Sequence, residues 1–176
     1  MPVDLASLTA KTLELVRHDL ARQSVRLETS FAPDLPPAQA DPQQLQQVLL
    51  NLFGNAIQAM AAGADAWLRV EVLGVGDQPA VRVTDGGPGI AADVLPRIFD
   101  PFFSTKAEGS GLGLSVSYAI ARAHGGDLRV ESTPASARRS RCSCRSPPPR
   151  APARRSSAPC WSTTIPTWPK PSPRCW

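Results

Sequence analysis

The chain has 176 residues and a formal net charge of +4, and this length is enough for one domain with its own hydrophobic core. It has no run of about 18 apolar residues, so no membrane-spanning helix is expected, and its first residues do not resemble a signal peptide. All 15 Asp and Glu, but only 10 of the 19 Lys and Arg, lie within residues 1–134. All four cysteines follow residue 134. The absence of cysteine from residues 1–134 fits a protein of a reducing compartment, and a cytoplasmic location is expected.

The first half of the chain predicts two helices around one strand. Leucine and valine recur at helical spacing over 5–22, and the alternation of apolar and polar residues over 25–31 is typical of a strand. The second helix is expected over 41–60, where Asp41 suits the N-cap and Pro42 suits the first helical position. Apolar residues cover one face of this helix, as in a helix packed on a core.

The second half of the chain adds strands and one long helix. In chain order we expect strands over 67–73 and 80–84, a helical turn over 91–99, a helix over 111–124 and a strand over 127–132. This order predicts an α/β fold, specifically a two-layer α/β sandwich in which helices cover one face of a mixed sheet.

A line of amide side chains runs beside the apolar face of the helix over 41–60. Its members recur at helical spacing and are Gln44, Gln47, Asn51, Asn55 and Gln58. Asparagine is a poor helix former because its short amide competes with the backbone for hydrogen bonds. The line therefore favours a ligand site at this edge of the helix, and a solvated stripe of amides is the alternative.

A glycine-rich turn follows the strand over 80–84 and begins at Asp85, in the sequence DGGPGI. A carboxylate at a strand end can accept a hydrogen bond from an exocyclic amine, and the glycines let a flat ring approach the backbone closely. The pattern is compatible with a binding site for a flat ring, whereas on its own such a sequence is more often a surface turn.

A second glycine-rich segment, GSGLGL over 109–114, runs into the helix expected over 111–124. Backbone N–H groups at the start of a helix, free of bulky side chains, form an anion site. The segment does not follow a strand, so a dinucleotide-binding fingerprint is not expected. Lys106 stands just before it and could reach a terminal phosphate, whereas a lone lysine is ordinarily a surface residue.

Taken in order, the amide helix, the strand followed by DGGPG, the sequence RIFDPFFSTK and the sequence GSGLGL resemble the ATP-binding catalytic domain of two-component sensor histidine kinases. That family belongs to the GHKL ATPases, together with gyrase, mismatch-repair ATPases and heat-shock chaperones. The resemblance covers residues 5–134 and favours the kinase branch, because GSGLGLSVSYAIARAHGG follows RIFDPFFSTK closely, as in a kinase lid. It implies a GHKL-type sandwich, with a domain of residues 1–134.

The resemblance also implies a reaction and its cofactors. Such a domain binds ATP and Mg²⁺ and transfers the γ-phosphate to a histidine on a separate dimerisation domain, in signalling to the receiver domain of a response regulator. This chain would be the catalytic module of a histidine kinase, and we expect that it cannot autophosphorylate alone because the acceptor domain is absent. Neither a nucleic-acid partner nor a membrane span is expected.

Roles for single residues follow from the same resemblance. Asn51 would hold Mg²⁺, Asn55 would face the phosphates, and Asp85 would pair with the adenine amine. Lys106 would meet the γ-phosphate, and Phe103 would contact the nucleotide. The adenine pocket would include Gly87, Gly89 and Ile90, the lid would be anchored by Phe99, Phe102 and Phe103, and the phosphate loop would include Gly109, Gly111, Leu112, Gly113 and Leu114.

Two departures from the family pattern affect the expected chemistry. Many relatives carry Glu where this chain has Gln47, and because an amide cannot act as a general base, we expect Gln47 to orient water or metal. The family's phosphate-accepting histidine lies upstream of this domain, and the one tempting substitute, His18, lacks the downstream proline of the acceptor motif. Two other functions stay open, namely a non-enzymatic nucleotide-binding adaptor and a serine-directed protein kinase of the same superfamily.

The last part of the chain, 135–176, is basic, rich in Pro, Arg and Ser, and free of acidic residues. It has three interpretations: a disordered tail, a basic arm that binds nucleic acid, or the product of a frameshift. In a shifted frame the codons permit a sequence like the end of a kinase domain, followed by one like the start of a receiver domain. We expect the last strand of the family's sheet to be missing, which would leave the strand over 127–132 as an unpaired edge.

Overall fold

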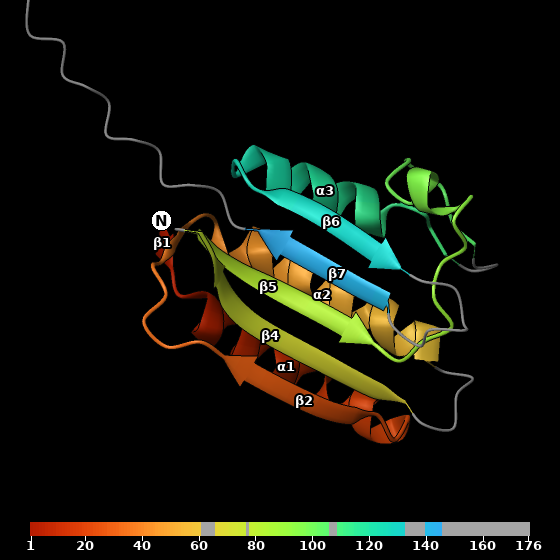
Figure 1. Ribbon diagram of the computed structural model, residues 1–176, viewed down its shortest axis with the longest axis horizontal. Coiled ribbons are helices and arrows are strands. Elements are labelled where there is room, and N and C mark those ends of the chain that lie inside the picture. The colour runs from red at the N-terminus through yellow and green to blue at the C-terminus, as the bar shows by residue number, and fades with distance from the viewer. Residues whose placement is uncertain (61–65, 77, 106–108, 133–139, 146–176) are drawn as a thin grey trace, which may run out of the picture.

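The structure, a computed structural model, describes residues 1–60, 66–76, 78–105, 109–132 and 140–145. Within these residues a five-stranded mixed sheet carries the helices α1, α2 and α3 on one face, which confirms the expected two-layer α/β sandwich (Figure 1). In chain order the elements are β1 (Pro2–Val3), α1 (Leu5–Arg22), β2 (Arg26–Phe31), β3 (Ala38–Gln39), α2 (Pro42–Met60), β4 (Trp67–Val75), β5 (Gln78–Asp85), a 3₁₀ helix (Leu95–Arg97), α3 (Gly113–Ala123), β6 (Asp127–Ser132) and β7 (Ser140–Arg145).

The helix α2 begins where the sequence predicts, because Asp41 caps it. The Asp41 carboxylate accepts hydrogen bonds from the backbone N–H groups of Gln43 at 2.8 Å and Gln44 at 3.4 Å. The helical turn expected over 91–99 is shorter than predicted and consists of the 3₁₀ helix, which has Pro96 in its first turn. None of the described helices is long and apolar enough to cross a membrane.

The strands of the sheet follow the order β2-β4-β5-β7-β6. β2 runs parallel to β4, and the other neighbouring pairs are antiparallel. Helix α2 packs on β5, and α3 packs on both α2 and β6. This arrangement brings the end of β5, the middle of α2 and the start of α3 to the same end of the sandwich.

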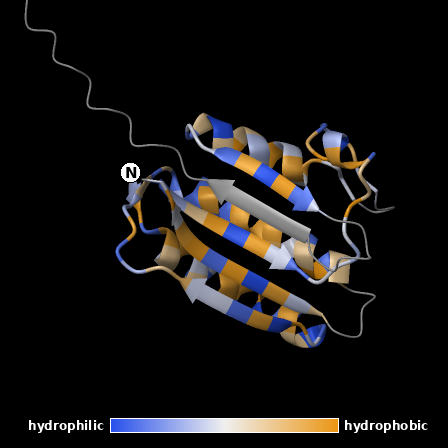
Figure 2. Cartoon of the chain, viewed as in Figure 1, coloured by the Kyte–Doolittle hydropathy of each residue, from blue (hydrophilic) through white to orange (hydrophobic). Residues whose placement is uncertain are grey.

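Apolar residues that alternate along the central strands form the core. On β4, Leu68, Val70 and Val72 are fully buried in one cluster with Phe53 of α2. Figure 2 shows this alternation as bands of hydrophobic and hydrophilic colour along β4 and β5. The strand pattern predicted from the sequence is therefore the pattern that joins the sheet to the helices.

The face of the sheet away from the helices carries charged side chains. Arg69 on β4 donates from Nη2 to Oε2 of Glu28 on β2 at 2.7 Å. This hydrogen bond holds the pKa of the Glu28 carboxyl below its usual range. Arg82 and Glu71 form a second pair on this face, with 3.7 Å between Nη1 and Oε2. Charge at these positions agrees with a sheet that is covered by helices on one side only.

The last strand of the sheet is present, so the prediction that it would be missing is wrong. β7 lies between β5 and β6, in register with residues 80–85 on one side and 127–132 on the other. Backbone N–H and C=O groups form these ladders, so a strand can exist without the apolar alternation that was used to predict strands. β6 is an edge strand of the sheet, and it is paired along its whole length with β7. Residues 146–176 lie outside the described part, and the three interpretations of the basic segment stay untested there.

Candidate functional site

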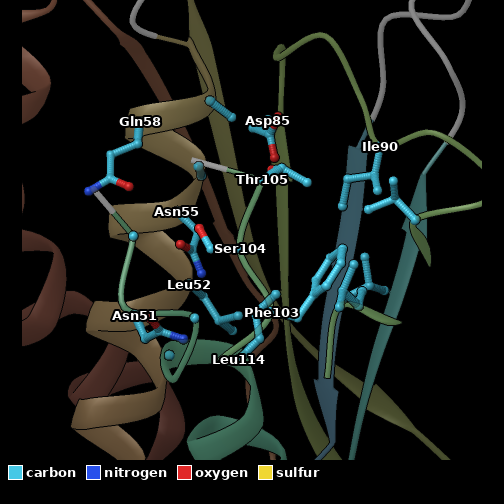
Figure 3. A pocket seen from close by; sticks show the side chains of 18 of the residues that line it. Asn51, Leu52, Asn55, Gln58, Asp85, Ile90, Phe103, Ser104, Thr105 and Leu114 are labelled. Carbon is cyan, nitrogen blue, oxygen red and sulfur yellow. The ribbon is translucent and has the colours of Figure 1, made fainter. Parts of the chain in front are cut away.

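A cavity of about 1070 Å³ opens where the middle of α2, the end of β5 and the start of α3 meet (Figure 3). Ligand cavities in proteins commonly enclose roughly 300–1,000 Å³, so this one has room for a nucleotide. Most of the predicted site residues line it, namely Asn51, Asn55, Asp85, Gly89, Ile90, Phe103, Gly109, Gly111, Gly113 and Leu114. Segments far apart in the sequence therefore meet around one space, as the resemblance implied.

The wall formed by α2 carries the two predicted asparagines. Asn51 and Asn55 are one helical turn apart, so both lie on the edge of α2 that lines the cavity (Figure 3). Both side chains are half-buried. The Asn51 amide donates a hydrogen bond from Nδ2 to the hydroxyl oxygen of Ser117 on α3, at 2.9 Å. This bond joins the two helices beside the cavity.

Asp85, the last residue of β5, lies at the other end of the cavity from Asn51 (Figure 3). Its Oδ1 accepts a hydrogen bond from the backbone N–H of Gly87 at 2.9 Å, which holds the carboxylate within the turn. Behind the turn, the indole of Trp67 packs so closely on Gly86 that a Cβ atom there would collide with it. Asp85 is the only charged residue among the described residues that line the cavity.

The glycine-rich segment before α3 lines the cavity largely with backbone. Gly111 has a φ of +66°, and a Cβ atom on it would collide with the carbonyl group of Phe102, so this position requires glycine. Gly113 is the first residue of α3, and a Cβ atom on it would collide with the side-chain oxygen of Asn51. Gly111 therefore lets the glycine-rich segment approach the backbone of Phe102, and Gly113 lets the start of α3 approach Asn51 on α2.

The three phenylalanines expected to anchor the lid occupy different surroundings. Phe103 lines the cavity, and the guanidinium of Arg97 lies 4.6 Å from the centre of its ring. Phe99 packs on Tyr118 of α3, with 5.1 Å between the ring centres. Phe102 is instead 77% exposed. Two of the three rings are therefore packed against neighbouring groups, and the third faces solvent.

Four predicted site residues are not placed on the described lining of the cavity. Gln47 lies one turn before Asn51 on α2 and is exposed. Gly87 is buried and does not line the cavity, but its backbone N–H donates a hydrogen bond to the Asp85 carboxylate. Leu112 lies within the glycine-rich segment, but it is 37% exposed and does not line the cavity. Lys106 lies outside the described residues, so its role remains a prediction.

The two histidines lie away from the cavity lining. His18 is exposed on α1. His124 is the C-cap residue of α3, close to the helix end expected at 124, and both of its ring nitrogens have polar partners. Nε2 accepts a hydrogen bond from the backbone N–H of Asp41 at 3.1 Å, and Nδ1 lies 2.9 Å from the carbonyl oxygen of Ile120. This histidine therefore links two helix ends.

Sequence reasoning missed a buried hydroxyl and the apolar part of the lining. The apolar part consists of Leu52, Ala56, Ala59, Val83, Val94, Ile98 and Val130. Ser117 is 2% exposed and lies three residues after Leu114 and four before Ala121, on the side of α3 that packs inward. A small polar residue within an apolar helical stripe is the signal that could have identified Ser117.

The arrangement suits binding and orientation of a ligand more than acid–base catalysis. The described lining offers the Asp85 carboxylate, the amides of α2 and the backbone of the glycine-rich segment. Mg²⁺ prefers oxygen ligands and is commonly held by one or two protein groups together with substrate phosphates. The Asn51 amide lies at the start of α3, where phosphates could bind, so the residues present fit Mg²⁺ held in this way. No cluster of three or more His, Cys, Asp or Glu that could hold a metal alone occurs in the described chain.

Comparison with known proteins gives consistent matches. The family model described as histidine kinase-, DNA gyrase B-, and HSP90-like ATPase matches residues 40–150. The chain is 46% identical to the sensor histidine kinase ZraS of Escherichia coli (strain K12) over 130 residues, which cover 74% of this chain and 28% of ZraS. The nucleotide-free catalytic domain of histidine kinase ThkA gives a TM-score of 0.74 at 28% identity, covering 84% of this chain and 94% of that domain. Full-length ShkA in complex with AMPPNP gives a TM-score of 0.72 at 28% identity, covering 84% of this chain and 30% of ShkA.

The match to the family model includes both the cavity and β7. The matched range of the family model contains every residue on the described lining, and it also contains β7. The chain spans little more than a quarter of the length of ZraS. The chain belongs to the histidine kinase-, DNA gyrase B- and HSP90-like ATPase family, together with the catalytic domains of two-component sensor histidine kinases.

Proposed function

We propose that the cavity binds ATP with Mg²⁺ and that this domain supplies the γ-phosphate to a histidine on a separate dimerisation domain, in two-component signalling. The observation that carries the proposal is the convergence of Asn51, Asp85 and the glycine-rich start of α3 on one cavity. ShkA, which has the same fold, was solved in complex with AMPPNP, and this supports an adenine nucleotide as the ligand class here.

The proposed nucleotide lies along the cavity with its base at the end of β5. There the Asp85 carboxylate can accept a hydrogen bond from the exocyclic amine of adenine, and apolar residues such as Val83 and Ile90 surround the ring. The phosphates then lie at the start of α3, where the backbone N–H groups of the first helical turn and the helix dipole favour negative charge. Asn51 and Asn55 face the phosphates from α2, and Asn51 holds Mg²⁺ through its amide oxygen.

Transfer of the phosphoryl group depends mainly on positioning and on neutralisation of charge, so a domain with these parts needs no nucleophile of its own. In the proposal Gln47 orients water or metal, and Lys106 meets the γ-phosphate. In the proposal the acceptor histidine lies on the dimerisation domain of a longer protein similar to ZraS, the catalytic domain is cytoplasmic, and the receiver domain of a response regulator is the partner.

We also propose that the catalytic domain extends to residue 145. The sequence predicted a boundary at 134, but β7 pairs with both β5 and β6 and therefore belongs to the sheet. Tests of nucleotide binding should accordingly use the full chain and not a fragment that ends at 134.

The first test is calorimetric titration of the full chain with ATP, with and without Mg²⁺. We expect Mg²⁺ to strengthen binding, and we expect Asn51→Ala to abolish this effect. Loss of the bond to the buried Ser117 hydroxyl should also lower the melting temperature somewhat, so a melting curve verifies that the variant is folded under the conditions of the titration. Gln44→Ala is a matched control, because Gln44 is an exposed amide on the same helix and does not line the cavity. Absence of Mg²⁺-dependent binding in the wild-type chain would refute the proposal.

The second test asks where the phosphate goes. The full chain is mixed with labelled ATP and the dimerisation domain of a relative such as ZraS. We expect acid-labile label on the added domain, because phosphohistidine hydrolyses in acid. Nucleotide binding without transfer would indicate a non-enzymatic adaptor, and acid-stable label on serine would indicate a serine-directed kinase.

A further inference from the structure

The Asn51 side chain lies against α3, beside Ser117 and Gly113. Ser117 accepts a hydrogen bond from Nδ2 at 2.9 Å, and Ser117 is 2% exposed. Gly113 leaves space for the side-chain oxygen of Asn51, since a Cβ atom at that position would collide with it. Ser117 therefore engages the Nδ2 end of the Asn51 amide, and the Oδ1 end lies beside Gly113.

The two ends of an amide differ in what they can bind. The oxygen can coordinate a metal ion, whereas the amino group can only donate hydrogen bonds. The terminal torsion of asparagine has a broad, roughly two-fold preference, so an asparagine without a fixed partner can present either end. Engagement of Nδ2 by Ser117 leaves Oδ1 at the start of α3, beside Gly113.

We propose that Ser117 is a positioning residue that orients the Asn51 amide, so that Oδ1 and not Nδ2 is presented to the metal–phosphate end of the site. This inference rests on the proposed function, and it adds a residue that does not itself line the cavity. Because Ser117 is buried, loss of its hydroxyl leaves the Nδ2 group without that partner and lets the amide turn over.

The orientation can be measured without any nucleotide. In the full chain labelled with ¹⁵N, the side-chain NH₂ signals of Asn51 are identified by their loss in Asn51→Ala. We expect Ser117→Ala to shift these signals and to speed their exchange with water. The matched control is Ser115→Ala on the same helix, because the Ser115 hydroxyl donates to the carbonyl oxygen of Leu112 at 2.9 Å, whereas the Asn51 amide bonds to Ser117. This control should leave the Asn51 signals in place.

The consequence for binding is measured by titration with ATP in the presence and absence of Mg²⁺. Removal of a group that orients a metal ligand commonly lowers metal affinity by roughly 10–100-fold. We expect Ser117→Ala to reduce the gain in ATP affinity on adding Mg²⁺ by about tenfold, with little change in the affinity measured without Mg²⁺. Ser117→Thr keeps the hydroxyl and should retain most of the gain, and melting curves verify that each variant folds.

The outcomes separate this inference from the proposed function. Unchanged Asn51 signals in Ser117→Ala would overturn the positioning role, whether or not the chain binds nucleotide. Shifted signals with an unchanged Mg²⁺ effect would also overturn it, as would equal losses of affinity with and without Mg²⁺. A wild-type chain that binds no nucleotide would refute the proposed function, and the NMR comparison would still decide whether Ser117 orients Asn51.

Discussion

The backbone N–H of Asp41 donates a hydrogen bond to Nε2 of His124, 3.1 Å away, although the two residues are 83 positions apart in the sequence. Nδ1 of the same ring lies 2.9 Å from the carbonyl oxygen of Ile120, which makes Nδ1 the protonated nitrogen and Nε2 the acceptor. The ring therefore joins the start of α2 to the end of α3, at the ends of these helices remote from the cavity.

Replacement of His124 tests this link between the helices. His124→Ala removes the acceptor of the Asp41 N–H, and we expect the free energy of unfolding to fall by roughly 1 kcal/mol, the typical net value of one hydrogen bond. His124→Gln supplies a carbonyl oxygen at similar reach and should restore part of this loss. Urea denaturation of the three proteins measures the effect, and an unchanged midpoint for His124→Ala would contradict it.

A second prediction concerns the contact between Gly113 and Asn51. Gly113→Ala places a Cβ atom on the side-chain oxygen of Asn51, so the amide must move. We expect the gain in ATP affinity on adding Mg²⁺ to fall by at least the roughly tenfold typical of a disturbed metal ligand. Titration with and without Mg²⁺ measures this change.

The control for that variant is Gly54→Ala. Gly54 lies within α2, and a Cβ atom on it would meet nothing within 4 Å. Alanine is the better helix former, so Gly54→Ala should raise the free energy of unfolding by roughly 0.5–1 kcal/mol and leave nucleotide binding unchanged. If both substitutions affect binding equally, the proposed contact with Asn51 does not explain the loss.

A third prediction concerns recognition of the base by Asp85. In Asp85→Asn, the side-chain oxygen can still accept the N–H of Gly87, but an amino group replaces the second carboxylate oxygen. A hydrogen bond to a charged group contributes about 1.5–3 kcal/mol, so ATP affinity should fall by roughly 10–100-fold. The preference for ATP over GTP should fall as well, and competition titrations measure both. Asp93→Asn, an exposed carboxylate outside the lining, should change neither.

A fourth prediction concerns the cap of α1. The Asp4 carboxylate accepts hydrogen bonds from the hydroxyl of Ser7 at 2.7 Å and from the N–H of Ala6 at 2.9 Å. The Ser7 bond is the main cause that lowers the pKa of the Asp4 carboxyl from its ordinary value of 3.8. At neutral pH, Asp4→Ala should reduce the free energy of unfolding by about 1 kcal/mol, which is typical for loss of an N-cap.

The pH dependence of this difference follows from the direction of the pKa shift. Because the pKa of Asp4 is lower in the folded chain, its stabilisation is fully present above 3.8 and is lost as the pH falls through the lower folded-state value. The difference in unfolding free energy between wild type and Asp4→Ala should therefore shrink below about pH 4. Denaturation at pH 7 and pH 3 measures it, and a constant difference would exclude the charged cap as the cause.

A fifth prediction concerns β7. A chain that ends after Ser132 lacks the strand between β5 and β6, and backbone groups of both strands lose their ladder partners. We expect this chain to melt at a lower temperature and to aggregate more readily than one that ends after Arg145. Comparison of the two chains by calorimetry measures the effect, and equal melting temperatures would show that β7 adds nothing to stability.

The parts of the fold that the sequence predicted are those with local signals. Asp41 and Pro42 mark the start of α2, and alternation of apolar residues marks β4 and β5, so these elements lie close to the predicted ranges. Asn51, Asp85 and the glycine-rich segment carry recognisable side chains at fixed spacing. Their meeting around one cavity was therefore expected from the resemblance.

The parts that the sequence did not predict depend on partners distant in the chain. β7 lacks an apolar pattern and is defined by the backbone ladders of β5 and β6. The short strands β1 and β3 pair through Pro2 with Gln39 and Val3 with Ala38, and neither strand contains more than two residues. The bond between Ser117 and Asn51 joins residues 66 positions apart, and no local pattern marks that pairing.

The position of β7 inside the sheet has a consequence for synthesis on the ribosome. β2, β4 and β5 leave the ribosome first and can pair with one another, whereas β6 emerges before β7, the strand that joins it to the sheet. Until β7 follows, β5 is an open edge at the centre of the future sheet, and such an edge is a site for pairing with other chains. The order of the strands in the chain therefore sets an interval, between synthesis of β5 and synthesis of β7, in which the incomplete sheet can pair with a neighbouring chain.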